Sequence, residues 1–359
     1  MTMKETWIQD AYHEAVPEDF HGGVKWQSPS NIALVKYWGK KGVQLPQNPS
    51  VSFTLSNCKT ETSVFFEKSD RFGLRFSFDG RENGEFQTKI KDFLMANIEL
   101  LPFIKQLDLH VQSRNTFPHS SGIASSASSM SALVMCLLDI ESQLKGNRDI
   151  DLRKASYLSR LASGSACRSV FPKTVVWGET PEVPGSSDEY AVSIEREIAP
   201  VFWDYRDSIL IVSDAKKAVS SRAGHALMDH NPYAATRYAT ARKDVADLLQ
   251  ALRKGDLEQF MAITESEALQ LHALMMCSDP SFILLKPNTL RIINALRDFR
   301  KETDIPVCFT LDAGPNVHVL YPAHHAELVE RFIMDELEPY CANGQWIADQ
   351  VGEGASKCR

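Results

Sequence analysis

Hydrophobic residues in the first half of the chain alternate with polar residues over several short stretches. Residues 51–55, 72–78 and 107–111 each place an apolar side chain at every second position. This period of two is typical of a strand that buries one face. Asp79-Gly80 directly follows the second stretch and indicates a tight turn. We therefore predict three half-buried strands.

Between and after these strands, apolar residues recur every three to four positions. This spacing predicts a helix over residues 90–101, and residues 124–143 and 152–162 are further predicted helices. Asp151 precedes the last of them, where a carboxylate can accept hydrogen bonds from the first N–H groups of a helix. Strands and helices in this order indicate the α+β class.

The second half of the chain begins after a polar stretch that contains Pro and Gly, GETPEVPGSSDEY at residues 178–190. Its predicted elements are, in order, a strand at 208–214, helical segments over about 231–277 and 287–302, the strand VCFTL, the loop DAGPN, the strand VHVLY and the helix AELVERFIMDEL. We place a domain boundary near residue 200, which predicts one domain over residues 1–200 and a second over residues 201–359.

The composition excludes several classes of function. A chain of 359 residues with 43% hydrophobic residues can bury a sizeable core, but its formal net charge of −7 argues against general nucleic-acid binding. No apolar run reaches the roughly 18 residues of a membrane helix, and the first residues are too polar for a signal sequence. The seven cysteines form no Cys-x-x-Cys pair. We expect a cytoplasmic protein that binds neither nucleic acid nor membrane.

One stretch, HSSGIASSASSMSALV at residues 119–134, is rich in small hydroxyl residues and runs into an apolar helix. Free N–H groups at a helix N-terminus bind phosphate, and small side chains let phosphate oxygens approach the backbone. Ser125 or Ser126 could add a hydroxyl to a phosphate or to its Mg²⁺. The alternative is a serine-rich helix start without a ligand.

Three other segments combine hydroxyl or amide groups with charge. SPSNIALVKYWGKKG at 28–42 carries Lys36 and Lys40, SGSACRS at 163–169 carries Arg168, and SDAKKAVSSRAG at 213–224 follows a strand. Each suits an anionic ligand, and each could instead be a solvated surface segment or an ion-pair residue.

TLDAGPN at 310–316 presents Asp312 on a turn between two apolar strands, where a general base could lie, although Asp is also a common turn residue. His119, His272 and His318 lack the spacing of metal ligands, so we expect them to be ordinary core or surface residues.

Taken together, six segments resemble the mevalonate diphosphate decarboxylases of the GHMP kinase superfamily. They are SPSNIALVKYWGKK, LPQNPSVSFTLS, SSGIASSAS, SGSACRS, VSDAKKAVSS and FTLDAGPN, and the resemblance extends from about residue 25 to residue 356. It implies an N-terminal domain like the second domain of ribosomal protein S5, a ferredoxin-like C-terminal domain, and a cleft between them. It also implies a homodimer.

The resemblance further implies a reaction in which ATP and mevalonate 5-diphosphate give isopentenyl diphosphate, CO₂, ADP and phosphate. The implied catalytic residues are Asp312, Lys36, Arg168 and Asn31. The implied substrate-binding residues are Tyr37, Lys40, Ser163, Ser165, Lys89 and Ser221. ATP would be bound by Ser121, Gly122, Ala124, Ser125, Ser126 and Lys216, with Ser126 also facing Mg²⁺.

Some residues depart from the family pattern. The phosphate loop reads Pro118-His119-Ser120-Ser121-Gly122-Ile123-Ala124-Ser125-Ser126, Pro172-Lys173 replaces a Gly-Gly pair, and Lys89 stands where an Arg is usual. These changes leave two alternatives open for the substrate: the same reaction on mevalonate 5-phosphate, or a mevalonate kinase that does not decarboxylate. A binding protein with an inactive site is disfavoured, since no charged catalytic group is missing.

Overall fold

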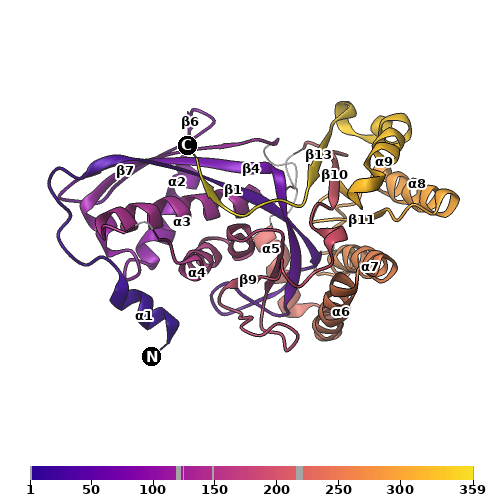
Figure 1. Cartoon of the computed structure of the whole chain (residues 1–359), viewed down its shortest axis with the longest axis horizontal. Coiled ribbons are helices and arrows are strands. Elements are labelled where there is room, and N and C mark those ends of the chain that lie inside the picture. Colours follow the sequence, from indigo (N-terminus) through magenta and orange to yellow (C-terminus); the bar gives the residue numbers. More distant parts are fainter. Residues whose placement is uncertain (1, 119–122, 124, 148, 216–220, 359) are drawn as a thin grey trace.

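The chain folds into two halves that each layer helices against a β-sheet, which confirms the α+β class (Figure 1). The computed structural model describes residues 2–118, 123, 125–147, 149–215 and 221–358. Within these ranges, no helix has the length and hydrophobicity needed to cross a membrane.

The sheet of the first half has eight strands, and its main order is β14-β1-β4-β7-β5-β6. β5 runs parallel to β7, while the other pairs are antiparallel. β8 pairs with residues 50–53 of β4, and β9 pairs with β8. The strands are β1 (His21–Val35), β4 (Ser50–Lys68), β5 (Gly73–Phe78), β6 (Arg81–Glu82), β7 (Leu107–Asn115), β8 (Thr174–Trp177), β9 (Ala191–Ser193) and β14 (Ser356–Lys357). The three strands expected from alternation, and the turn at Asp79-Gly80, are therefore confirmed. The expectation that residues 51–55 are only half-buried is wrong, because Ser52 and Thr54 are buried as well.

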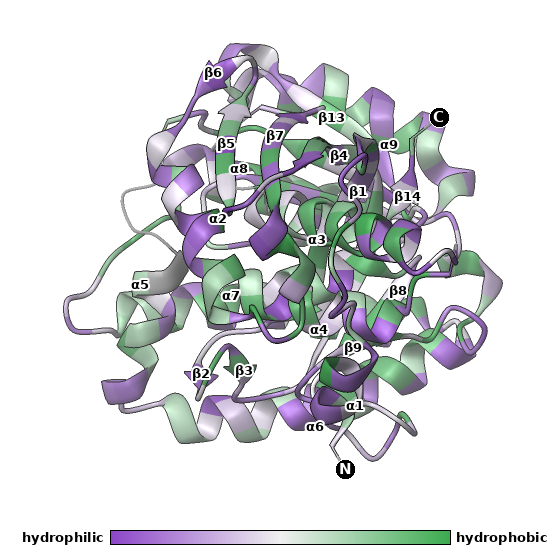
Figure 2. Cartoon of the chain, turned by 90° about the vertical axis from the view of Figure 1, so that its left-hand side faces the viewer, coloured by the Kyte–Doolittle hydropathy of each residue, from purple (hydrophilic) through white to green (hydrophobic). Residues whose placement is uncertain are grey.

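Helices α1 (Met3–Asp10), α2 (Gly84–Ala96), α3 (Ser125–Leu144) and α4 (Leu152–Ala162) belong to this half. α3 packs on β1 and β4, and its apolar side chains make it one of the greenest elements in Figure 2. The helix predicted over 90–101 ends earlier, at Ala96, because the Asn97 side chain turns back to donate to the carbonyl of Phe93 at 2.8 Å.

The second half contains a four-stranded antiparallel sheet of order β11-β12-β10-β13, with β10 (Arg206–Leu210), β11 (Cys308–Thr310), β12 (Val317–Tyr321) and β13 (Trp346–Gln350). The strand predicted at 208–214 begins and ends earlier, because beyond Leu210 the chain leaves the ladder to form a bend. The helices are α5 (Ser221–Ala226), α6 (Ala234–Lys254), α7 (Leu257–Met276), α8 (Pro287–Thr303) and α9 (Ala326–Phe332), and a π-helical turn at Ile333–Leu337 continues α9.

The two halves share a hydrophobic cluster. Ile32 and Leu34 of β1 and Phe53 of β4 pack in it with Tyr205 and Phe260 of the second half. This explains why the last eight residues of β1 are all buried and do not alternate. A short two-stranded hairpin, β2 (Lys40–Lys41) with β3 (Leu45–Pro46), follows β1.

A polar contact adds to this junction. The carboxylate of Asp349, on β13, accepts hydrogen bonds from the backbone N–H groups of Ser56, Asn57 and Cys58 at 2.7–2.8 Å. From there the chain returns to the first half, where β14 pairs with β1 (Figure 1). The two halves thus meet at a packed interface.

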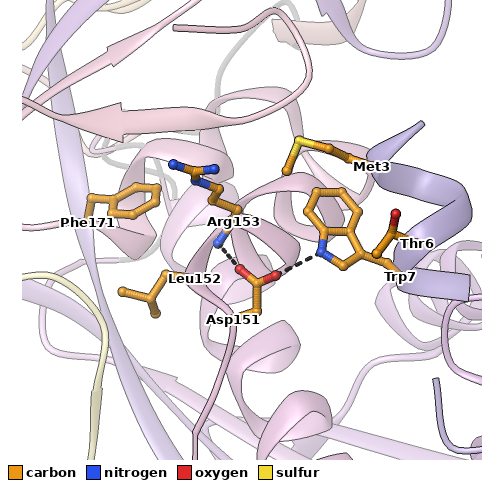
Figure 3. Close-up of a pocket in the computed structure, with 7 residues that line it drawn as sticks. All are labelled: Met3, Thr6, Trp7, Asp151, Leu152, Arg153 and Phe171. Carbon is orange, nitrogen blue, oxygen red and sulfur yellow. Dashed lines mark hydrogen bonds between the residues drawn. The ribbon is translucent and has the colours of Figure 1, made fainter. Parts of the chain in front are cut away.

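Asp151 caps α4 as predicted, and it also fastens the N-terminal helix. Its side chain accepts hydrogen bonds from the N–H groups of Arg153 at 2.8 Å and Lys154 at 3.2 Å, and from the Trp7 indole at 2.8 Å. Figure 3 shows Trp7, Asp151 and Arg153 among the residues that line a surface cavity of about 570 Å³ between α1 and α4. One carboxylate therefore joins α1 to the first half.

Replacing Asp151 by Ala is expected to lower the free energy of unfolding by about 1–2 kcal/mol, because the cap and the indole lose their acceptor. Asp151→Asn keeps an oxygen at the same position and is expected to lose less than half as much. Urea unfolding followed by circular dichroism measures both. Equal losses for the two variants would contradict the capping role.

Candidate active site

A cleft of about 1330 Å³ lies between the two halves and receives side chains from both. It brings together ten of the residues singled out in the sequence, although they come from segments up to 281 positions apart. These residues are Asn31, Lys36, Tyr37, Lys40, Lys89, Ser126, Ser163, Ser165, Arg168 and Asp312.

The lining of the cleft is more cationic than the chain as a whole. Its described cationic side chains are Lys4, Lys36, Lys40, Lys89, Arg160 and Arg168, against the acidic Glu85, Asp92, Glu189 and Asp312. The whole chain has a formal net charge of −7. Local charge of this kind attracts and holds a small anion inside an acidic protein.

Lys36 and Asp312 form an ion pair at the meeting point of the halves. The Nζ atom of Lys36 lies 3.3 Å from Oδ1 of Asp312, and it also donates to the carbonyl of Ala33. Lys36 is almost fully buried, whereas 27% of the Asp312 side chain is exposed to the cleft. Burial lowers the pKa of Lys36, and the neighbouring carboxylate opposes that shift. The pair places a reachable carboxylate beside a desolvated ammonium group.

A second buried ion pair holds the peptide of Lys36. Glu267 of α7 accepts from the backbone N–H of Lys36 at 2.8 Å, and Arg237 of α6 donates to the carbonyl of Lys36 at 3.3 Å. Arg237 also grips Glu267 with both of its terminal nitrogens. The backbone that carries Lys36 is therefore fixed by two helices of the second half.

His272 of α7 performs a similar task for Asp312. Its Nε2 atom lies 3.1 Å from the backbone carbonyl of Asp312, and burial lowers the pKa of His272 to about 4. A neutral imidazole whose N–H meets a carbonyl donates one hydrogen bond and adds no charge. As expected, His272 is a buried core histidine, and its bond holds the loop that presents Asp312. His318 is also buried, and its Nδ1 lies 2.8 Å from a carboxylate oxygen of Asp207. His119 lies outside the described residues.

Arg168 is held by neutral groups. Its Nε atom donates to Oδ1 of Asn31 at 3.1 Å and one terminal nitrogen donates to the hydroxyl of Ser50 at 2.8 Å. Asn31 in turn donates to the hydroxyl of Ser169 at 2.8 Å. In the described part of the chain no carboxylate forms an ion pair with Arg168, and burial lowers its pKa. A buried guanidinium in this state is prepared to bind an incoming anion.

The serine-rich segment lies partly outside the described residues, which exclude Ser121, Gly122, Ala124 and Lys216. α3 begins at Ser125, and Ser126 lines the cleft. Ser125 lines a small adjoining cavity together with Ser126. Ser221 begins α5, but the placement of its side chain is not described.

Sequence reasoning missed several residues of the cleft. Arg160 of α4 donates to the carbonyls of Glu189 and Val43 at 2.7 and 2.6 Å. It therefore connects the β2–β3 hairpin to α4. His225 of α5 also lines the cleft. Glu267 and Arg237 resemble surface charges in sequence. The segment of Arg160 gives no local signal of a site, because its role depends on contacts between distant segments.

The fold and the cleft define an enzyme of the GHMP kinase superfamily. Residues 28–191 match the family model of the diphosphomevalonate decarboxylase-like N-terminal domain, and residues 208–355 match that of the mevalonate 5-diphosphate decarboxylase C-terminal domain. The chain belongs to the diphosphomevalonate decarboxylase family.

Individual relatives agree with this assignment. Diphosphomevalonate decarboxylase of Ganoderma lucidum is 33% identical over 331 residues, which cover 85% of this chain and 80% of that protein. The crystal structure of mevalonate diphosphate decarboxylase from Staphylococcus aureus has a TM-score of 0.82 and 26% identity, covering 95% of this chain and 99% of that one. A structure of MDDEF in complex with MVAPP, AMPPCP and magnesium has a TM-score of 0.80 and 29% identity, covering 95% and 100%.

Proposed function

We propose that this enzyme catalyses the ATP-dependent decarboxylation of mevalonate 5-diphosphate, giving isopentenyl diphosphate, ADP, phosphate and CO₂. The observation that carries the proposal is the pair of Lys36 and Asp312 beside Arg168, a buried cation whose partners among the described residues are neutral, in a cationic cleft. This arrangement provides a base, a charge to offset the transferred phosphoryl group, and a partner for a carboxylate or phosphate. The ligands of the related MDDEF structure support it.

In this proposal Asp312 orients the C3 hydroxyl of the substrate and accepts its proton as the oxygen attacks the γ-phosphorus of ATP, while the bond from that phosphorus to the bridging oxygen breaks and ADP leaves. Lys36 lies beside Asp312 and offsets the negative charge that develops on the transferred group. Phosphate then leaves from C3, the C–C bond to the carboxylate breaks, and its electron pair forms the new double bond. Arg168 holds the substrate carboxylate or phosphate, and Asn31 holds Arg168.

The substrate's diphosphate would lie towards the other end of the cleft, where hydroxyl and ammonium groups gather. We assign it to Tyr37, Lys40, Ser163, Ser165, Lys89 and Ser221. Lys40 starts the β2–β3 hairpin, and Ser163 caps the C-terminal end of α4 before Arg168 in the next turn. Except for Ser221, whose side chain is not described, these residues line the cleft.

We assign ATP to the serine-rich segment and the loop after β10, with Ser121, Gly122, Ala124, Ser125, Ser126 and Lys216. Mg²⁺ keeps several waters and binds substrate phosphates, so one protein hydroxyl suits it. Ser126, at the start of α3 and on the wall of the cleft, fits that requirement. When bound, the ion would neutralise the phosphate charges of ATP.

One assay tests the proposal. Purified enzyme with ATP and Mg²⁺ is expected to form ADP and CO₂ in equal amounts from mevalonate 5-diphosphate. We expect a kcat/KM at least about 100-fold higher than for mevalonate 5-phosphate, since the second phosphate makes more than one charged hydrogen bond. Preference for the monophosphate would assign the shorter substrate, and ADP without CO₂ would assign a kinase.

Three further parts of the proposal concern organisation. We divide the chain into domains near residue 200, and the two family matches, at 28–191 and 208–355, support that division. A homodimer and a cytoplasmic location stay predictions.

A further inference from the structure

His225 lies on the wall of the cleft and packs against the aromatic rings of Tyr37 and Trp38. Its ring centroid is 4.4 Å from that of Tyr37 and 4.7 Å from that of Trp38. The preceding residue, Gly224, permits this approach, because a Cβ atom there would lie 2.6 Å from the Trp38 ring. Only 7% of His225 is exposed. Packing on both neighbours fixes the position of the imidazole.

One nitrogen of this imidazole is already engaged. Nδ1 accepts a hydrogen bond from the backbone N–H of Gly39 at 3.0 Å. Gly39 has a φ of +102°, and a Cβ atom there would collide with Tyr238, so this backbone is also held in place. Because Nδ1 accepts, a neutral ring must carry its proton on Nε2.

The surroundings keep the ring neutral. Burial holds the pKa of His225 well below its ordinary value, and the nearby cations Lys40 and Arg168 lower it further. Tyr37 is the third titratable group beside the ring, and burial raises the pKa of its phenol, so that group also keeps its proton. His225 is therefore an uncharged donor in the neighbourhood of two cations.

Nε2 of His225 and the hydroxyl of Tyr37 are two neutral groups that could donate to a ligand. Among the described residues, the buried hydroxyl of Tyr37 has no hydrogen-bond partner, and the hydrogen bond of the His225 ring engages Nδ1 and leaves Nε2 to the cleft side. Unsatisfied buried polar groups are rare and costly, and they mark places that a ligand completes. An acceptor that suits two neutral donors and the cations Lys40 and Arg168 is an anion with several oxygens.

We propose that His225 is a specificity-determining residue whose Nε2–H donates to the terminal phosphate of the substrate's diphosphate. The assignment rests on the proposed function for the identity of that substrate. The terminal phosphate is chosen because His225 is bonded to the backbone of Gly39, directly before Lys40 at the start of the β2–β3 hairpin, where the proposed function places the diphosphate.

A neutral donor suits this role better than another cation would. The attraction between charges falls slowly with distance, so a lysine still attracts a monophosphate that lies beyond its hydrogen-bond reach. A hydrogen bond is lost once donor and acceptor separate beyond about 3.5 Å. A fixed N–H group therefore detects whether the second phosphate is present.

Two substitutions test the proposal. His225→Met removes the donor and introduces an apolar side chain of similar length. His225→Gln keeps an N–H donor and cannot ionise. The matched control is His230→Met, which changes an exposed histidine of the next helical turn. Circular dichroism and thermal unfolding check that each variant is folded.

For His225→Met we expect kcat/KM for mevalonate 5-diphosphate to fall about 10- to 100-fold, the effect of one hydrogen bond to a charged phosphate. The value for mevalonate 5-phosphate should change less than threefold. His225→Gln should recover most of the loss, and His230→Met should behave like the wild type. Equal losses on both substrates, or no recovery with Gln, would overturn the proposal.

A binding measurement separates this proposal from the proposed function. Calorimetric titration with inorganic pyrophosphate, in the absence of ATP, should show at least tenfold weaker binding to His225→Met than to the wild type. Binding of inorganic orthophosphate should differ much less. If the wild type releases no CO₂ but this difference holds, the proposed reaction is wrong and the role of His225 stands. If the pyrophosphate affinities are equal, the role of His225 is wrong whatever the reaction.

Discussion

Asp312→Asn is expected to reduce kcat by at least about 100-fold while KM for the phosphorylated substrate changes little. The change keeps the shape of the side chain and removes its charge and basicity. It also removes the carboxylate that raises the pKa of Lys36 against the effect of burial, so that pKa should fall. Steady-state release of CO₂ and ADP measures the loss, which corresponds to about 2.7 kcal/mol.

Two comparisons make this test specific. Asp304→Asn changes an exposed aspartate at the end of α8 and should leave kcat within twofold of the wild type. The double variant Lys36→Met/Asp312→Asn should be little slower than Asp312→Asn alone, since groups that act as one unit are not additive. Turnover of Asp312→Asn within a few-fold of the wild type would show that this carboxylate is not the base.

Glu267→Gln is expected to lower the free energy of unfolding by about 3–5 kcal/mol. The substitution leaves Arg237 as a buried charge without its counterion, and both side chains are at least 98% buried. It also weakens the acceptor for the N–H of Lys36, so kcat should fall more than the loss of folded protein explains. Urea unfolding and the rate per folded molecule give the two quantities.

The matched control is Asp247→Asn, which removes one partner of the surface pair between Lys243 and Asp247 on α6. An exposed pair of this kind contributes at most about 0.5 kcal/mol. A small loss of stability for Glu267→Gln, comparable to the control, would contradict the stabilising role of the buried Arg237–Glu267 pair. Normal stability with slow turnover would place Glu267 in the chemistry.

The sequence by itself determined the elements whose pattern is local. Alternation in residues 72–78 requires one buried and one solvated face, and a carboxylate at Asp151 has the right position to cap the helix that follows. Asp312 could be singled out because a Gly-Pro turn between two apolar strands leaves its side chain on a loop. These features depend only on neighbours within a few residues along the chain.

Only the tertiary structure decided how these pieces act on one another. NIALV does not alternate, because β1 packs against both α3 and α7 and both of its faces are buried there. Lys36 meets Asp312 across 276 positions of sequence. Glu267, Arg237 and His225 look like ordinary polar residues on helices. Their roles arise when burial removes water, so that one carboxylate can fix a peptide and one imidazole can remain neutral in the neighbourhood of cations. Desolvation is a property of the packed fold, and no short stretch of sequence records it.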